Sequence, residues 1–168
     1  MTGISDFKSV FKGGARANLF KVEFEFPAAL GIDQQTDDAH YFIKAASLPA
    51  SVIAPIEVSY RGRKLKVAGD RTFEPWTITV INDGTMDLRN AFEKWSSAIN
   101  SHWSNTTNKT AVDSPSAYMV DMKVHQLDRS GDDAQATKTY NFAACWPSNV
   151  AAIDLGYESN DAIEEFTV

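Results

Sequence analysis

The side chains best suited to acid–base or nucleophilic chemistry are three histidines and one cysteine, which lie far apart along the chain. His40, His102 and His125 fall near a strand start, at a helix end and within a strand, without the helical spacing of paired zinc ligands. Cys145 stands alone in the strand-like run 142–146, so an internal disulfide is excluded. We expect surface or packing histidines, a half-buried cysteine, and no catalytic, cofactor or metal site.

Three pairs of adjacent carboxylates are the remaining candidates for chemistry. The aspartates at 37–38 precede His40 and could touch a metal ion, and those at 132–133 could bind calcium weakly, but neither pair has the ordered ligand spacing of a calcium loop. The glutamates at 164–165 could form an acid–base dyad, yet they alternate with apolar neighbours as on two faces of a strand. Solvated loops and a strand are the expected structures.

Positive charge is concentrated in one stretch between two predicted strands. Five of the sixteen basic residues fall within eleven positions, and they are Arg61, Arg63, Lys64, Lys66 and Arg71. Clustered arginines make directional, charge-assisted bonds with carboxylates, so we expect a basic loop over residues 61–71 that binds an acidic protein surface. The alternative is a solvated hairpin loop.

Composition limits the class of protein. The net charge of −6 and the pI near 5.0 disfavour a dedicated nucleic-acid binder, which would present a net basic face. A chain of 168 residues that is 43% hydrophobic can bury a core, and its length predicts a single domain over 1–168. No export signal is visible, and no run approaches the roughly 18 apolar residues of a spanning helix, so no membrane partner is expected.

Hydrophobic alternation with a period of two dominates the chain. The apolar residues at 20, 22, 24 and 26 share one face of a strand whose polar face carries Glu23 and Glu25. Further strands are predicted at 41–46, 56–60, 65–68, 76–81, 118–127, 137–146, 151–157 and 163–168. The strands at 118–127 and 137–146 should pair as a hairpin, and positions 140, 142, 144 and 146 should share one face.

One segment instead has a helical period. A helix at about 85–101 is expected, with Thr85 as its cap and Asp87 in its first turn. Its apolar stripe comprises Leu88, Phe92, Trp95 and Ile99. This stripe favours packing on a sheet over a ligand or cofactor site. The sequence predicts a mainly β fold, an antiparallel sandwich or barrel with this helix on one side or end, followed by an exposed loop at 102–116.

The N-terminal arm, residues 1–15, has an amphipathic spacing. Phe7, Val10 and Phe11 carry its apolar side. The arm could pack on a neighbouring subunit or form a lid over its own barrel. Strand edges with no closure device are available for joining neighbours.

Taken in order, several segments of the chain resemble the tail tube proteins of contractile-tailed bacteriophages. They are KAASLP at 44–49, YRGR at 60–63, AGDR at 68–71, WTITVIND at 76–83, LRNAFEKW at 88–95, AIDL at 152–155 and IEEFTV at 163–168. The resemblance implies a β-barrel or sandwich with one helix, six copies joined into a ring by shared sheet, and rings stacked into a hollow tube inside a sheath. In the family the final strand usually continues beyond the segment similar to 166–168, whereas this sequence stops there. Either the last strand is short here or the given sequence is trimmed, and ring closure through that strand stays open.

The partners implied by this resemblance are other copies of the chain, the tail sheath protein, and baseplate and tail-terminator proteins. The tape measure protein and DNA would occupy the lumen without specific binding, in a virion tail assembled in the host bacterial cytoplasm. A ring of six chains would carry −36, six times the formal charge of one, and acidic groups in the channel would repel phosphate. Glu23 and Glu25 are candidates for that lining, with an ordinary solvated strand face as the alternative.

Three other functions stay open at this point. A tube subunit of a phage-derived injection or secretion device would share the fold. A small-molecule-binding β-barrel would need an enclosed apolar cavity, and the aromatic content of the chain allows one. An enzyme would need a convergent set of polar residues, which the sequence does not display.

Overall fold

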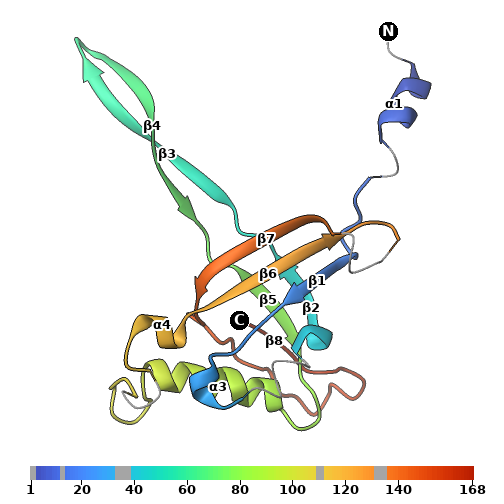
Figure 1. Ribbon diagram of the computed structural model, residues 1–168, viewed down its shortest axis with the longest axis vertical. Helices are drawn as coiled ribbons and strands as arrows, with labels where there is room; N and C mark the ends of the chain where they lie inside the picture. Colours follow the sequence, from blue (N-terminus) through green and yellow to red (C-terminus); the bar gives the residue numbers. More distant parts are fainter. Residues whose placement is uncertain (1–2, 12–13, 33–38, 109–111, 131–135) are drawn as a thin grey trace. The chain divides into compact units, whose positions relative to one another are not determined.

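The computed structural model describes residues 3–11, 14–32, 39–108, 112–130 and 136–168. The chain divides into two compact units, which are Met1–Tyr41 with Met86–Ser148, and Phe42–Thr85 with Asn149–Val168. Within the described residues the strands form three antiparallel sheets, accompanied by a few helices (Figure 1). The predicted mainly β fold with a helix is confirmed, and these sheets keep open edges instead of closing into a barrel.

The first unit contains a sheet in the order β1-β6-β7. Its strands are β1 (Phe20–Glu23), β6 (Val120–Leu127) and β7 (Ala136–Cys145). The predicted hairpin is confirmed as the antiparallel β6–β7 pair. The alternation predicted beyond β1 is also confirmed, because Val22, Phe24 and Phe26 are all buried although the strand ends at Glu23.

One prediction about β7 is wrong. The expected common face of positions 140, 142, 144 and 146 is interrupted at Ala144, which has a left-handed φ of 55°. Its N–H donates to Oδ1 of Asp121 at 2.9 Å, and the ladder shifts register between Val120 and Met122. Such a bulge moves the following side chain to the other face, so Cys145 is half-buried and Ala144 is exposed.

The helix α3 (Asp87–Ile99) supplies one wall of the first unit's core. Its buried residues are Leu88, Ala91, Phe92, Trp95 and Ala98. Phe24 and Phe26 pack edge-on against Phe92 and Trp95, with ring centroids 5.2 to 6.4 Å apart. Trp95 is 1% exposed, and its indole Nε1 donates to the carbonyl of Tyr118 at 2.9 Å. The predicted aromatic stripe therefore serves packing.

The ends of α3 differ slightly from the prediction. The N-cap position is Met86, not Thr85, and it has a left-handed φ of 56° without a side-chain cap bond. Asp87 lies in the first turn as expected, where its charge favours the helix dipole. Ile99 is only half-buried, because a 3.6-residue period brings Ala98 onto the buried stripe at the last turn. This unit also contains the helices α1 (Ile4–Phe11) and α4 (Pro115–Tyr118), the 3₁₀ turn η1 (Ala28–Leu30), and the helical residues 39–41.

The second unit contains a sheet in the order β2-β5-β8. Its strands are β2 (Ile43–Ser47), β5 (Thr77–Ile81) and β8 (Glu165–Thr167). The buried residues Val80 and Phe166 face each other across the β5–β8 pair, and Ile43 pairs with Val80 on the other side. β8 covers three residues of the strand predicted at 163–168.

The predicted strand at 151–157 is wrong. The N–H of Ala151 donates to the carbonyl of Thr167 at 2.8 Å, but residues 152–163 then run as a loop that returns to β8. Leu155 and Tyr157 are 77% and 105% exposed. A strand requires a ladder partner along its length, and apolar alternation alone cannot supply one.

The predicted basic loop at 61–71 is also wrong in conformation. β3 (Ser51–Tyr60) and β4 (Arg63–Phe73) form one long antiparallel hairpin, drawn in Figure 1 as a twisted ribbon that projects beyond the sheet of its own unit. Only Arg61 and Gly62 form the turn, with φ of 46° and 81°, the left-handed pair of a type I′ turn. The lysines here alternate with Leu65 and Val67, and this period of two belongs to a strand.

Candidate assembly surfaces

The register of the β3–β4 hairpin produces one apolar face. Its residues are Ile56, Val58, Tyr60, Leu65 and Val67. All five are exposed, from 47% to 68%. A two-stranded ribbon has no second layer with which to bury such a face, and contiguous exposed apolar groups mark an interaction surface. We refer to these five residues as the apolar hairpin face.

The opposite face of the hairpin is polar and largely self-paired. Glu57 accepts from Lys64 at 2.6 Å and lies 4.0 Å from Lys66, which is its register partner. These side chains are 41% to 67% exposed, so each pair is worth less than about 1 kcal/mol. Two of the predicted contact residues, Lys64 and Lys66, thus have a carboxylate within their own chain.

The hairpin tip, residues 60–66, also carries two arginines, which differ from the lysines in having no carboxylate partner among the described residues. The guanidinium of Arg61 lies 5.3 Å from the ring centroid of Tyr60, and Arg63 is the register partner of the same tyrosine. In the described part of the chain neither arginine contacts a carboxylate. Both are exposed and available to a carboxylate outside the chain.

Arg71 is separated from the tip. It lies eight positions beyond Arg63 on β4, which corresponds to about 27 Å of extended strand. Its Nη1 donates to Oγ of Ser51 at 2.9 Å. The five predicted basic residues therefore form a tip pair, a pair bound to Glu57 and one residue near the base, instead of one cluster.

A bulge near the middle of the hairpin requires Gly69. The register shifts between Ile53 and Pro55, and a Cβ at Gly69 would lie 2.5 Å from the carbonyl oxygen of Ala54 and 3.0 Å from Cγ1 of Ile56. Only glycine allows this close approach of the two strands.

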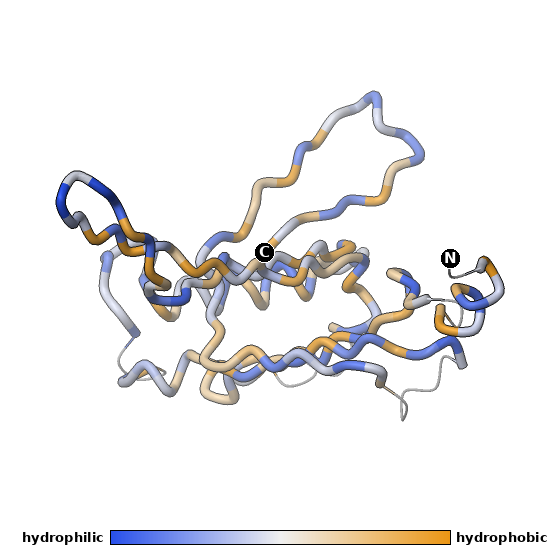
Figure 2. The backbone as a smooth tube through the Cα atoms, turned by 90° about the horizontal axis from the view of Figure 1, so that it is seen from above, coloured by the Kyte–Doolittle hydropathy of each residue, from blue (hydrophilic) through white to orange (hydrophobic). Residues whose placement is uncertain are grey.

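The C-terminal loop, residues 150–164, is the second exposed surface of this unit. It surrounds an open hollow of about 620 Å³, lined by apolar residues such as Ile153 and Leu155 together with carboxylates such as Asp154. Figure 2 shows it as the wide loop that returns to the C-terminus. The N–H of Asn82 donates to the carbonyl of Glu164 at 2.9 Å and ties one end of the loop to β5. Sequence reasoning missed this surface, since it interpreted the segment as a strand.

The helix α1 is a third exposed apolar surface. Phe7 and Phe11 stack with ring centroids 5.2 Å apart, and Ile4 and Val10 are 75% and 80% exposed. No residue of α1 is buried. Isolated helices this short are marginal in water, so packing on a partner would stabilise it.

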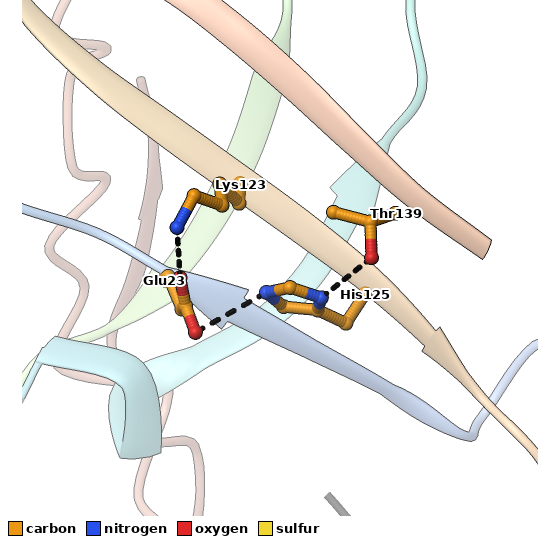
Figure 3. A network of polar contacts seen from close by, with 4 residues as sticks. All are labelled: Glu23, Lys123, His125 and Thr139. Atoms are coloured by element: carbon orange, nitrogen blue, oxygen red, sulfur yellow. Dashed lines mark hydrogen bonds and ion pairs between the residues drawn. The ribbon is translucent and has the colours of Figure 1, made fainter. Parts of the chain in front are cut away.

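The two carboxylates predicted to line a channel differ in their surroundings. Glu23 on β1 lies 3.0 Å from Lys123 Nζ and 3.2 Å from Nε2 of His125 on β6, and Nδ1 of His125 lies 2.9 Å from Oγ1 of Thr139 on β7 (Figure 3). The Lys123 hydrogen bond lowers the pKa of Glu23 below 4.5 against the opposing effect of desolvation, and His125 lowers it further. Glu25 is exposed.

The other candidates for chemistry lie apart from one another. The His40 ring packs on the Tyr41 ring with a centroid distance of 3.8 Å, and the centroids of the His102 and Trp103 rings are 6.2 Å apart. Cys145 is free and half-buried as predicted, and burial, helped by the charge of Asp121, raises the pKa of its thiol. Within the described ranges no group of three or more His, Cys, Asp or Glu side chains could hold a metal ion. The aspartates at 37–38 and 132–133 lie outside the described residues.

The two adjacent glutamates of the C-terminal segment have separate partners. Glu165 pairs with Lys44 of β2, whereas Glu164 Oε2 accepts from Nδ2 of Asn82 at 3.2 Å. This agrees with the predicted placement on two sides of a strand. Among the described helices, none is long and apolar enough to cross a membrane.

Three features of the described residues are typical of a structural protein that assembles with other copies or partners. They are the exposed sheet edges, the apolar hairpin face and the exposed amphipathic helix α1. The profile of the family described as phage tail tube protein matches residues 15–168. The chain belongs to this family, and its function is that of a structural tail tube protein.

Individual relatives agree with this assignment. The tail tube protein gp19 of Enterobacteria phage T4 is 35% identical over 167 residues, covering 98% of this chain and 94% of the relative. The tail tube protein of Serratia phage KSP90 is 28% identical over 170 residues, covering 99% and 92%. A solved chain from the sheath–tube complex of an extracellular contractile injection system, PVC, in its extended state has a TM-score of 0.52 at 16% identity, covering 99% of this chain and 93% of that one. At this identity the likeness concerns the fold alone.

Proposed function

We propose that six copies of the chain form a ring and that the rings stack into the hollow inner tube of a contractile phage tail, through which DNA passes during injection. The observation that carries this proposal is the apolar hairpin face, which the single chain leaves exposed. Membership of the tail tube family supports it. The open edges of the sheets β1-β6-β7 and β2-β5-β8 are where neighbours in a ring would add strands.

Contacts between copies would involve the predicted residues in distinct roles. The tip residues Arg61 and Arg63 would bind carboxylates of the next ring, since they have none of their own. Lys64, Lys66 and Arg71 would contribute from the flanks of the hairpin. In α1, the stacked Phe7 and Phe11 would pack on a neighbouring copy.

The lumen would be acidic. Six chains carry −36, six times the −6 of one chain, which disfavours tight binding of phosphate and lets DNA slide. Of the two lumen candidates, Glu25 would contribute the stronger field, because Lys123 partly neutralises Glu23. The tape measure protein would occupy the same channel before DNA does.

The remaining partners follow from the place of a tube in a tail. The similar solved chain comes from a sheath–tube complex, and we extend this arrangement to a tail sheath protein around the present tube. Baseplate and tail-terminator proteins would bind the two ends, and assembly would take place in the host cytoplasm. The phage relatives favour a virion tail over an injection device. No catalytic step is part of this function.

The test is purification followed by light scattering and negative-stain electron microscopy over a concentration series. Six chains of 18.5 kDa predict a ring of about 111 kDa, and tubes should have uniform width. Baseplates are added to a parallel sample, so that a missing nucleus is recognised. A particle of 18.5 kDa under both conditions would refute the proposal.

A further inference from the structure

We propose that the C-terminal loop, residues 150–164, is the surface that receives the hairpin tip of a second copy of this chain. The proposal rests on the proposed tube and names the acceptor of its basic hairpin. Both halves of the contact then lie in the same unit of the chain. The tip is residues 60–66, and the acceptor is the loop that begins beside β8 at residue 151 and returns beside β5 at residue 164.

The loop is anchored at both ends and surrounds an open hollow. Hydrogen bonds from Ala151 N to Thr167 O at 2.8 Å and from Asn82 N to Glu164 O at 2.9 Å fix its two ends. Between them the chain surrounds the hollow of about 620 Å³, a volume typical of binding pockets. Leu155, Tyr157 and Ile163 lie along it and are 77%, 105% and 72% exposed. Exposed apolar surface of this extent around a hollow is typical of an interaction site.

Charge identifies the partner. Residues 149–168 contain no lysine or arginine, and their acids are Asp154, Glu158, Asp161, Glu164 and Glu165. The tip at 60–66 contains four basic residues and no acid. Glu164 and Glu165 are engaged by Asn82 and Lys44, but Asp154 has no donor among the described residues, and the same holds for Glu158 and Asp161.

The two surfaces also match in their apolar content. Tyr60 and Leu65 are 68% and 64% exposed and flank the tip arginines, just as the exposed residues of the loop flank its free carboxylates. Arg61 and Arg63 can each donate in a bidentate manner to a carboxylate. The contact would then bury apolar groups around charge-assisted hydrogen bonds, the usual composition of a specific interface.

The contact must join different copies. In Figures 1 and 2 the hairpin tip and the C-terminal loop lie at opposite ends of their unit, so the hairpin cannot reach its own loop without folding back. A contact of tip to loop is heterologous, and a heterologous contact repeats from copy to copy without limit unless it closes into a ring. In the tube, the second copy would belong to the next ring.

Charge exchange tests the assignment. Two double variants reverse the charge on one side of the contact each: the tip variant is Arg61→Asp with Arg63→Asp, and the loop variant is Asp154→Arg with Asp161→Arg. We expect each variant to lower the amount of sedimentable tube at fixed concentration by about tenfold or more, because like charges then face each other. The quadruple variant should assemble again, since its acidic tips meet basic loops. A 1:1 mixture of the two double variants should also assemble, with the two variants alternating along the tube so that each tip meets a loop of opposite charge. Matched controls on other exposed sites, Arg16→Asp with Arg129→Asp and Glu74→Arg with Asp113→Arg, should assemble as the unmodified protein does.

The outcomes separate the two proposals. If the unmodified protein forms no rings or tubes, the tube itself is refuted. If it forms tubes and the tip variant blocks them, but the loop variant assembles normally or the exchange does not restore assembly, only the acceptor assignment is overturned. Circular dichroism and the mass of the unassembled variants show whether each variant folds.

Crosslinking gives a second readout that does not depend on charge. In a Cys145→Ser background, Arg63→Cys is combined with a cysteine at Tyr157, Ser159 or Ile163, and assembled tubes are oxidised. We expect a ladder of disulfide-linked copies for at least one position, because a bridge forms only between nearby cysteines. Arg63→Cys with Asp113→Cys is the control. Intact tubes without a ladder at any of the three positions would overturn the proposal.

Discussion

The apolar hairpin face should control assembly without contributing to the stability of the single chain. Val58 and Leu65 are directly opposite in the register and retain 47% and 64% of their accessible surface. Full burial of either side chain is worth about 1.5–3 kcal/mol, so covering what is still exposed contributes about 1 kcal/mol for Val58 and about 1.5 kcal/mol for Leu65. Replacing both with serine should therefore cost each hairpin about 2.5 kcal/mol of contact energy.

This loss multiplies in a ring. With six hairpins, the addition of one ring to another would lose on the order of 15 kcal/mol, enough to abolish stacking at micromolar concentration. The assay is sedimentation of tubes over a concentration series, with electron microscopy of the pellet. The melting temperature of the unassembled variant should match that of unassembled native protein, because substitutions at exposed positions change stability by at most about 0.5 kcal/mol.

Trp103→Ser is the matched control, since Trp103 is 96% exposed but lies outside the hairpin. It should leave assembly intact. Tubes that form from the Val58→Ser, Leu65→Ser variant at the native critical concentration would refute the role given to this face.

Three further predictions concern single residues. Because the pKa of Glu23 is lowered on folding, its ion pair stabilises the chain above the unfolded pKa near 4.5, and this contribution is lost as the pH falls through the lower folded value. In the unassembled Val58→Ser, Leu65→Ser variant, Glu23→Gln should therefore cost about 0.5 kcal/mol or less at pH 7, and a smaller amount at acid pH, in urea titrations. Equal losses at both pH values would contradict this. Trp95→Phe should lower the free energy of unfolding by about 2–3 kcal/mol, since it leaves the Tyr118 carbonyl without its donor and opens a cavity; a cost under 0.5 kcal/mol in the same titration would show that the site relaxes. Gly69→Ala should distort the β3–β4 hairpin, because the added Cβ would lie 2.5 Å from the Ala54 carbonyl oxygen. The amount of sedimentable tube should fall while the melting temperature of the unassembled chain is unchanged, and a normal yield of tubes would mean that the bulge adjusts.

The hairpin illustrates how much local pattern can predict. Alternation of Leu65 and Val67 with lysines indicates a strand, and the structure extends it to Phe73. The clustered charges at 61–71 nevertheless led to the prediction of a basic loop, with a strand only at 65–68. β4 is not buried; both faces of the ribbon are solvated in the single chain, so charge carries little cost there.

The C-terminal segment shows the opposite error. Its apolar residues predicted a strand at 151–157, yet a strand forms only where another strand offers unpaired N–H and C=O groups. Ala151 donates to the carbonyl of Thr167 on the open side of β8, but residues 152–163 then leave the edge of the sheet, so no ladder forms along the segment. Apolar alternation does not state whether a segment stays beside the edge strand that it meets.

By itself the sequence determined the mainly β class, the α3 stripe with its buried Phe92 and Trp95, the β6–β7 hairpin and, through the ordered resemblance, the tail tube family. The structural predictions among these depend on short-range periodicity, which solvent exposure imposes on every amphipathic element, whereas the family rests on the resemblance of the ordered segments. Three features required the folded chain: the five basic residues divide into three groups, Glu23 is paired whereas Glu25 is exposed, and the C-terminal loop surrounds an open hollow. Each of these depends on strand register and on contacts between residues distant in sequence, such as Glu23 with Lys123, and a one-residue shift in register would exchange every such contact.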